Sequence, residues 1–544
     1  MKLNKYIFSV LLLIFGAAFT SCDDFLDETP NKAGSAYIYH MDQLKEMTGS
    51  LDLYLFSNPR YVSYGLTNSY MDEQMYFNDA IDCTPEYFYI AQNGGGDNWL
   101  MWTMDKTTWT EDQYRMSCTW TPSWERIYRF NTVLENLETV QQTTEQDKWQ
   151  VAGEAYFGRA YYHFLLMVQY CLWDESKPGI GYREGTNPGE VPARETVKYT
   201  LDKIYADLDN AETALTKAGK TVFEQKTNFR PTVPTVKAFR ARVDLYRGNY
   251  ESALTNANAA LQAHNKLVTI KDDPNYELSG IMQEVHFLDE TKTKITKTFE
   301  CKYAPMLQSL GTQAFAEYEE LYLASATQPG YSWSTYALPM SESHYNLFDK
   351  ENDARWLYFY NTMYPLLGMY TIQEVAEIDG KMTPGCISAE NQKWLKPWMM
   401  HSYTRFYGNG YIDILGMTTA EMMLIKAECL ARDGKTSEAA QVLKDLRKTR
   451  FMNQESANNI GGSIQEVLDE RQREMTYLWR FFDIKRLNGA ENAGIALKRK
   501  VLSNQMDLNS VTEMVIEADD PRWALPFYKN EAQDMGWAQN EGWE

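Results

Sequence analysis

Residues 237–261 read KAFRARVDLYRGNYESALTNANAAL, and this stretch decides the fold class. Ala238 and Ala241 are small enough to let a second helix approach closely, and Gly248 marks a turn. Residues 250–261 then place small or apolar side chains at helical spacing. The stretch therefore predicts two helices that pack closely around a glycine turn.

Residues 421–446 have the same plan, with Ala427, Gly434 and Ala439 in comparable places. A helix, a glycine turn and a second helix with small contact residues form the pattern of tetratricopeptide repeats, whose unit is about 34 residues long. Stacked pairs of this kind share one core. Alanine-rich helical hairpins of another kind would show similar residues, so the two repeats alone leave that alternative open.

Helical spacing continues toward the N-terminus. Apolar residues recur every three or four positions in residues 127–137 and 204–215, and a third helical run covers residues 149–170. Residues 174–196 are rich in Gly and Pro and predict a loop. Residues 266–404 combine many aromatics and turn residues with weak periodicity, which predicts loops, short helices and short strands. We expect a mainly α scaffold with this variable region as its cap.

Composition limits the function. The chain has 544 residues, 53 Lys and Arg, 74 Asp and Glu, and a net charge of −21. Apolar residues at 44% are enough for a large core, which excludes disorder as the main description. Nucleic-acid binding requires clustered Lys and Arg, and no such cluster is present.

The first residues predict an export signal. Residues 6–19 are mainly apolar and too short for a spanning helix, which needs about 20 apolar residues, so residues 1–21 are interpreted as a signal peptide. Thr20 and Ser21 before Cys22 are typical of a bacterial lipobox. In this interpretation Cys22 carries acyl chains such as palmitate and becomes the N-terminus of the mature protein. Residues 22–40 would form the tether. A cleaved signal followed by an incidental cysteine is the alternative.

Cysteine and histidine give no sign of a metal site. The six cysteines beyond Cys22 have no Cys-x-x-Cys spacing, and the six histidines are all isolated. We expect buried thiols rather than a disulfide framework, no metal and no cofactor.

Two aromatic-rich loops are candidate glycan-binding sites. Sugar rings have apolar C–H faces that match indole and phenol rings, while polar neighbours bond the hydroxyls. The first loop follows a Gly triplet and the second lies near residue 333; their candidate residues are Asp97, Asn98, Trp99, Trp102, Trp109, Tyr331, Trp333 and Tyr336. The alternative is that these rings pack the loops against the scaffold.

Several motifs follow one another in an order typical of one family. They are CDDFLDETP at 22–30, GEAYFGRAYYHFLLMVQY at 153–170, ERQRE at 470–474, RFFDIKR at 480–486 and QNEGW at 539–543. With the two repeats, these motifs make the chain resemble the SusD/RagB family of nutrient-uptake lipoproteins across nearly its whole length.

The resemblance implies tetratricopeptide-like helix pairs beneath a variable cap. It divides the chain into an N-terminal helical region at 41–265, the cap at 266–404 and a C-terminal region at 405–544. It also implies a lipid anchor in the outer membrane, a surface location, and a SusC-like TonB-dependent transporter as partner. The cargo would be an oligosaccharide or, in some members, a peptide.

An enzyme is the competing class. A glycoside hydrolase needs two carboxylates placed across a cleft, and the sequence alone cannot place such a pair. A Gly-x-Ser-x-Gly nucleophile motif is absent from the sequence. We expect binding without catalysis.

The RFFDIKR segment is interpreted as structural. Phe481 and Phe482 are expected to pack into the scaffold, and Arg480 to pair with Asp483 on one helix face. Asp353 and Arg355 are expected to fix a turn. None of these residues is assigned to ligand binding.

Overall fold

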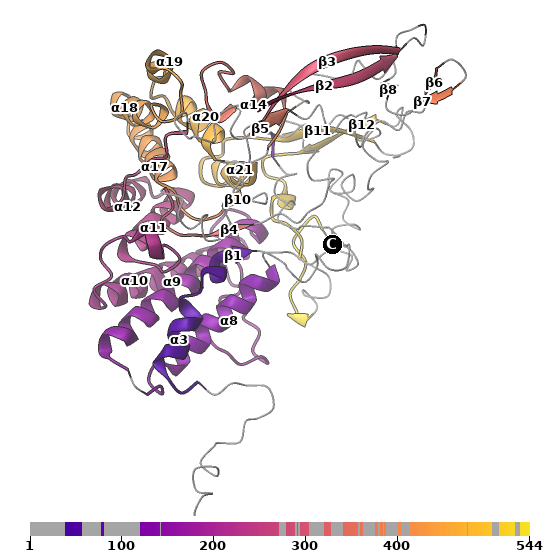
Figure 1. Cartoon of the computed structure of the whole chain (residues 1–544). Helices are drawn as coiled ribbons and strands as arrows, with labels where there is room; N and C mark the ends of the chain where they lie inside the picture. Colours follow the sequence, from indigo (N-terminus) through magenta and orange to yellow (C-terminus); the bar gives the residue numbers. More distant parts are fainter. Residues whose placement is uncertain are drawn as a thin grey trace, which may run out of the picture.

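The computed structural model describes most of the scaffold and separate parts of the rest. The described residues are 38–56, 78–80, 120–141, 143–270, 279–288, 291, 294–303, 320–327, 341–356, 360–362, 376–378, 381–383, 386–387, 401–403, 413–475, 477–502, 511–527 and 534–543. Helices dominate them and form a continuous stack, from α3 (Met41–Thr48) at one end to α19 (Gln454–Asn458) at the other (Figure 1). The predicted mainly α, tetratricopeptide-like fold is confirmed.

Three helices form the N-terminal part of the stack: α8 (Trp120–Asn136), α9 (Glu145–Tyr170) and α10 (Val197–Lys217). The side chains of Thr144 and Thr196 begin α9 and α10 as N-caps, each accepting a backbone N–H from the first turn. Helix α9 packs against both neighbours and is buried almost all round along its C-terminal two-thirds. A helix that is apolar on every face is stable only when it is enclosed in this way.

The two predicted repeats are helical hairpins, formed by α11 (Val233–Arg247), α12 (Tyr250–Ala263), α17 (Thr419–Arg432) and α18 (Thr436–Arg447). Gly248 and Gly434 end the first helix of each hairpin at φ 80° and 76°, where a side chain would be strained. Ala238 and Ala241 are fully buried, and α12 packs against α17, so the hairpins stack on one another.

Two further helices complete the scaffold, α20 (Ile464–Glu474) and α21 (Tyr477–Glu491). The other described elements are short: η1 (Leu51–Tyr54), η5 (Gln225–Thr227), α14 (Glu342–Asn346) and η13 (Pro521–Trp523). The predicted loop at 174–196 contains no helix or strand.

Strands form small sheets beside the helices (Figure 1). One has the order β1-β4-β10, another β3-β2-β8, and three are pairs, β11-β12, β5-β9 and β6-β7. Their bounds are β1 (Leu55–Phe56), β2 (Ser279–Leu288), β3 (Lys294–Tyr303), β4 (Ala326–Thr327), β5 (Tyr360–Thr362), β6 (Ala376–Ile378), β7 (Lys381–Thr383), β8 (Cys386–Ile387), β9 (His401–Tyr403), β10 (Asp413–Ile414), β11 (Leu497–Leu502) and β12 (Val511–Ile516). The boundaries proposed at 265/266 and 404/405 stay predictions.

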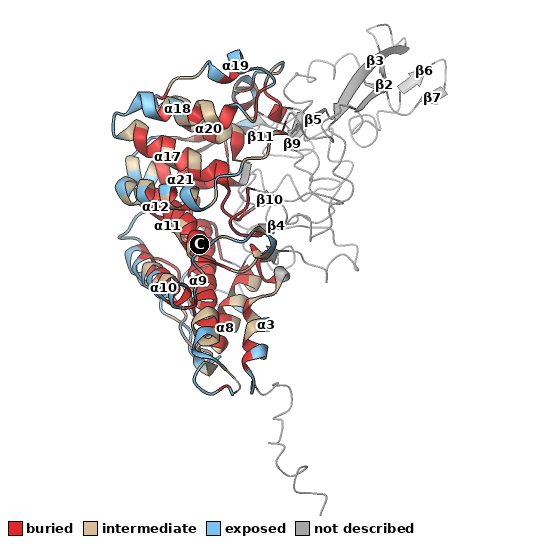
Figure 2. Ribbon diagram, turned by 60° about the vertical axis from the view of Figure 1, so that its left-hand side comes forward, coloured by how far each residue is buried: buried red, intermediate tan, exposed pale blue. Residues whose placement is uncertain are grey.

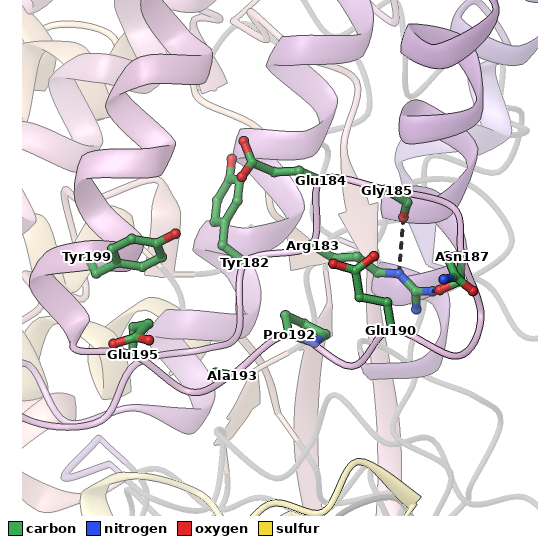
Figure 3. Close-up of a pocket in the computed structure, with 10 residues that line it drawn as sticks. All are labelled: Tyr182, Arg183, Glu184, Gly185, Asn187, Glu190, Pro192, Ala193, Glu195 and Tyr199. Atoms are coloured by element: carbon green, nitrogen blue, oxygen red, sulfur yellow. Dashed lines mark hydrogen bonds between the residues drawn. The ribbon is translucent and has the colours of Figure 1, made fainter.

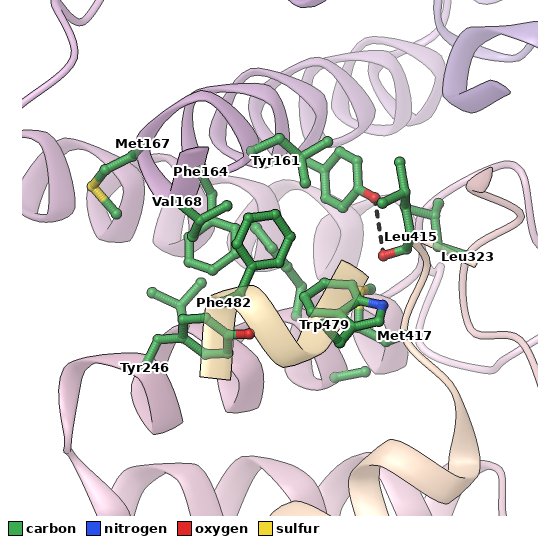
Figure 4. Packing of buried hydrophobic residues seen from close by; sticks show 14 of the residues in the cluster. Tyr161, Phe164, Met167, Val168, Tyr246, Leu323, Leu415, Met417, Trp479 and Phe482 are labelled. Carbon is green, nitrogen blue, oxygen red and sulfur yellow. Dashed lines mark hydrogen bonds between the residues drawn. The ribbon is translucent and has the colours of Figure 1, made fainter. Parts of the chain in front are cut away.

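One apolar core extends along the helical stack (Figure 2). At its centre, rings from α9, α11 and α21 pack together, with Phe164, Tyr246 and Phe482 among them (Figure 4). The hydroxyl of Tyr161 donates to the carbonyl of Leu415 at 3.2 Å, so this phenol is satisfied inside the core. Phe481 and Phe482 are both buried, which confirms their predicted packing role.

Of the two predicted ion pairs in the scaffold, one is confirmed and one is wrong. Arg355 pairs with Asp353 at 2.8 Å in a buried turn, as expected. The predicted pair of Arg480 with Asp483 is wrong. Arg480 pairs with Asp79 at 2.6 Å, and Asp483 accepts from Arg471 and Arg486, two buried arginines, at 2.8 and 2.7 Å.

Candidate functional site

The predicted glycan-binding and lipidation residues fall outside the described part of the chain. Asp97, Asn98, Trp99, Trp102, Trp109, Tyr331, Trp333 and Tyr336 lie outside the described residues, as do Cys22 and residues 1–21. Their roles stay predictions.

The loop between α9 and α10 forms a pocket of about 260 Å³ (Figure 3). Tyr199, in the first turn of α10, and Glu195 lie at one end, while Arg183, Asn187 and Glu190 gather at the other. The rest of the lining is Tyr182, Glu184, Gly185, Pro192 and Ala193. Sequence reasoning identified the loop but did not predict a pocket in it.

Buried polar side chains of α8 and α9 hold the loop through hydrogen bonds to its backbone. The amide of Asn131 on α8 donates to the carbonyls of Arg183 and Gly185 at 3.1 and 3.2 Å. The Nε2 atom of His163 on α9 accepts the backbone N–H of Arg183 at 3.1 Å. Since Asn131 and His163 are fully buried, these bonds fix the loop backbone without competition from water.

A bidentate ion pair joins α9 to α10 close to these hydrogen bonds. Arg159 donates through Nε and Nη2 to the two carboxylate oxygens of Asp207 on α10, both at 2.7 Å, and through Nη1 to Asn131 at 3.0 Å. The hydroxyl of Tyr182 also donates to Asp207, at 2.5 Å. We call Asn131, Arg159, His163, Tyr182 and Asp207 the loop-support network.

Burial and charge set the pKa values in this network. Burial opposes the charge of Arg159, but the hydrogen bonds and charge of Asp207 outweigh burial and raise the pKa of the guanidinium. Burial and the Asp207 carboxylate raise the pKa of the Tyr182 hydroxyl well above its ordinary value. Burial lowers the pKa of His163 to about 3. His163 is therefore neutral near pH 7, with Nδ1 2.8 Å from the carbonyl of Arg159, so Nδ1 donates and Nε2 accepts.

Residues near the C-terminus hold the other side of the loop. Arg194 donates to the carbonyl of Gly179 at 3.0 Å and to the Asn540 side chain at 2.9 Å. The same guanidinium lies 4.6 Å from the ring centre of Phe527. The indole N–H of Trp537 donates to the carbonyl of Pro192 at 3.1 Å.

The pocket offers both hydrogen-bonding groups and an exposed ring. Among the residues that the structure describes, the carboxylates of Glu190 and Glu195 have no hydrogen bond or ion pair, whereas Glu184 pairs with Lys203 at 2.6 Å. Arg183 donates to the carbonyls of Gly185 and Asn187 at 3.2 and 2.7 Å. These groups suit the binding of an uncharged polar molecule better than an anion.

Within the described ranges, no group of three or more His, Cys, Asp or Glu side chains could hold a metal ion. In the same ranges, no helix is long and apolar enough to cross a membrane.

Comparisons with known proteins agree with this architecture. A family model described as "Starch-binding associating with outer membrane" matches residues 24–245, and the SusD family model matches residues 319–543. The SusD-like protein P38 of Formosa agariphila is 22% identical over 395 residues, which cover 68% of this chain and 72% of that protein.

Two solved structures illustrate the shared fold. A SusD superfamily protein from Bacteroides vulgatus superposes with a TM-score of 0.57 at 14% identity, covering 93% of this chain and 100% of that one. A laminarin-binding SusD-like protein gives a TM-score of 0.53 at 14% identity, with coverage of 93% and 100%. Since the two family models together match residues 24–245 and 319–543, the chain belongs to the SusD family.

Proposed function

We propose that the protein is a cell-surface lipoprotein that captures oligosaccharides and delivers them to a SusC-like TonB-dependent transporter in the outer membrane. The observation that carries this proposal is the family match, which includes a model for starch-binding proteins associating with the outer membrane. A laminarin-binding protein of the same fold supports a glycan as cargo. The protein binds and releases its cargo without breaking bonds.

The aromatic loops are the proposed capture site. Trp99, Trp102 and Trp333 would stack on sugar rings, because an indole face matches the C–H face of a pyranose. Asp97 and Asn98 would bond the hydroxyls, and Trp109, Tyr331 and Tyr336 would extend the platform. Release to the transporter then requires only that these contacts are individually weak.

A lipid on Cys22 would hold the protein at the membrane. Acyl chains anchor a folded domain without a spanning helix, and two signals are needed for stable attachment. The acidic residues that follow, Asp23, Asp24, Asp27 and Glu28, are proposed as the signal for surface export.

Calorimetry tests the proposal. The full chain, in a detergent without a sugar head group, is titrated with neutral and acidic oligosaccharides, and each sample is then analysed for cleavage products. Saturable binding with intact glycans supports a receptor. Cleavage would contradict the non-catalytic role. Binding of peptides without binding of any glycan would mean that the cargo is a peptide. Co-purification of a TonB-dependent transporter from outer membranes tests delivery.

A further inference from the structure

We propose that the pocket at residues 182–199 binds one ring of an uncharged sugar. The inference rests on the proposed function, because it assumes that glycans are the cargo. It adds residues 182–199 to the residues that contact the glycan, and a rule for which sugars bind there.

The size of the pocket fits a single ring. Pockets for drug-sized ligands begin at roughly 300 Å³. At about 260 Å³, this pocket is smaller than that and opens between a loop and the start of a helix. A chain of sugars could therefore place one ring in the pocket while its neighbours stay outside.

The lining has the two kinds of surface that a sugar requires. Tyr199 is 42% exposed and Val191, next to the lining residue Pro192, is 43% exposed, so apolar surface stays uncovered at the rim. Glu190 and Glu195 can accept from sugar hydroxyls, and the Asn187 amide can donate. A sugar with one apolar face and several hydroxyls matches this combination.

The charge of the pocket selects against acidic sugars. Within the described part of the chain, Glu190 and Glu195 have no cationic partner, whereas the neighbouring Glu184 pairs with Lys203. Among the described lining residues, Arg183 is the one cation, so the two carboxylates of Glu190 and Glu195 outnumber it. Its guanidinium is held in place by the backbone carbonyls of Gly185 and Asn187. A uronate or sulfated sugar would therefore be repelled by a net negative charge, whereas a neutral sugar would not.

The loop is built more rigidly than a connection between two helices requires. Loops usually lie on the surface with few buried polar contacts. Here the buried loop-support network ties the loop to α8, α9 and α10, and Asn540 and Trp537 hold the opposite side. A binding loop that is already ordered loses little conformational entropy when its ligand arrives.

Photo-crosslinking locates the sugar directly. The full chain, in a detergent without a sugar head group, is irradiated with a neutral trisaccharide carrying a diazirine, and labelled peptides are mapped by mass spectrometry. A uronate-containing trisaccharide with the same diazirine serves as the charge comparison. The variants are Tyr199→Ala and Glu190→Gln. Tyr128→Ala is the matched control, because Tyr128 is 45% exposed on α8 and does not line the pocket.

The proposal expects labelling within residues 182–199 by the neutral probe and at most weak labelling there by the uronate. We expect Tyr199→Ala to reduce this labelling by about five- to tenfold, which is the loss of affinity expected when one stacking contact is removed. Tyr128→Ala should leave the labelling unchanged. Labelling confined to other segments would overturn the subsite while keeping the glycan receptor. Equal labelling of the pocket by both probes would overturn the charge rule. No saturable labelling anywhere would overturn both the subsite and the proposed function.

Discussion

Arg242 and Glu421 form a fully buried bidentate ion pair between the two predicted repeats. Nε and Nη2 of Arg242 lie 2.7 and 2.6 Å from the carboxylate oxygens of Glu421, and neither side chain has exposed surface. Arg242 also donates to the carbonyls of Leu415 and Gly416, at 2.8 and 3.1 Å. One residue of α11 thus fixes both α17 and the segment that leads into it.

Breaking this pair should destabilise the scaffold strongly. Arg242→Met leaves a buried carboxylate without its partner, and we expect the free energy of unfolding to fall by about 3–5 kcal/mol. Adding Glu421→Gln should recover part of the loss, because the two effects are not additive within one pair. Urea denaturation followed by circular dichroism measures both variants.

The matched control for that experiment is the exposed pair of Lys198 and Asp202, whose N–O distance is 2.5 Å. Lys198→Met should change the unfolding free energy by no more than about 1 kcal/mol. If Lys198→Met lowered the unfolding free energy as much as Arg242→Met, burial would not explain the importance of the Arg242–Glu421 pair.

Acid should weaken the protein through His163 and His344. Burial lowers both pKa values to about 3, against an ordinary 6.5, so the unfolded chain binds more protons between these limits. Stability from these neutral histidines is therefore complete above pH 6.5 and is lost as the pH falls toward 3. At about pH 5, each of these histidines should lower the free energy of unfolding by about 2 kcal/mol relative to neutral pH.

His163→Gln tests this assignment through the pH dependence alone. Urea midpoints are compared at about pH 7.5 and about pH 5, so any loss common to both conditions cancels. The variant should show a smaller acid shift than the unmodified protein. An identical shift would assign the acid sensitivity to other groups.

Gly158 should not accept alanine, although alanine is the better helix former by about 1 kcal/mol. A Cβ at this position would lie 2.1 Å from Cζ of Phe130, and both residues are buried between α8 and α9. We expect Gly158→Ala to destabilise by about 1–3 kcal/mol through overpacking. Gly189→Ala is the control, because its nearest neighbour would be the Asn187 side chain at 3.5 Å on an exposed loop. Thermal unfolding of the two variants should separate them clearly.

Removal of the tryptophans should weaken oligosaccharide binding. We expect Trp99→Ala, Trp102→Ala and Trp333→Ala each to raise the dissociation constant by about threefold to tenfold, through loss of stacking. The comparison is Trp149→Ala, which removes a ring that Lys217 covers at 3.9 Å. If the control weakens binding as much as the loop variants, the aromatic loops are not the capture site.

Cys22→Ala should release the protein from the membrane. Without the acylated cysteine, the chain should lose incorporation of labelled palmitate and move from the membrane to the soluble fraction. Neutralising Asp23, Asp24, Asp27 and Glu28 should keep the lipid but reduce protease accessibility at the cell surface. Unchanged surface display would reject the export role of the acidic residues.

The fold was predictable where the signal is local. Gly248 and Gly434 end helices at positive φ, and small residues beside them permit close packing, so sequence spacing identified both hairpins. The partner of Arg480 was not predictable in this way. Asp79 lies 401 positions away, and helix spacing reports only neighbours three or four residues apart.

The pocket was missed for a related reason. Its shape comes from the backbone path of an irregular loop, and that path depends on side chains from three helices. A signal was nevertheless present. Arg159 and His163 interrupt the apolar run of α9, and Asp207 lies beside Leu208 on the buried face of α10. Polar residues on faces that should be apolar indicate a buried network, and such networks fix irregular segments.

The contact between Arg194 and Asn540 has a consequence for how the protein matures. The two residues are 346 positions apart, and a chain is synthesised from its N-terminus. The loop beside Arg194 must therefore wait until residues 537–540 have been synthesised before Asn540 and Trp537 can hold it. A chain that stops before residue 537 would lack both contacts with the loop, so ligand binding in the pocket would distinguish molecules that contain this segment from those that do not.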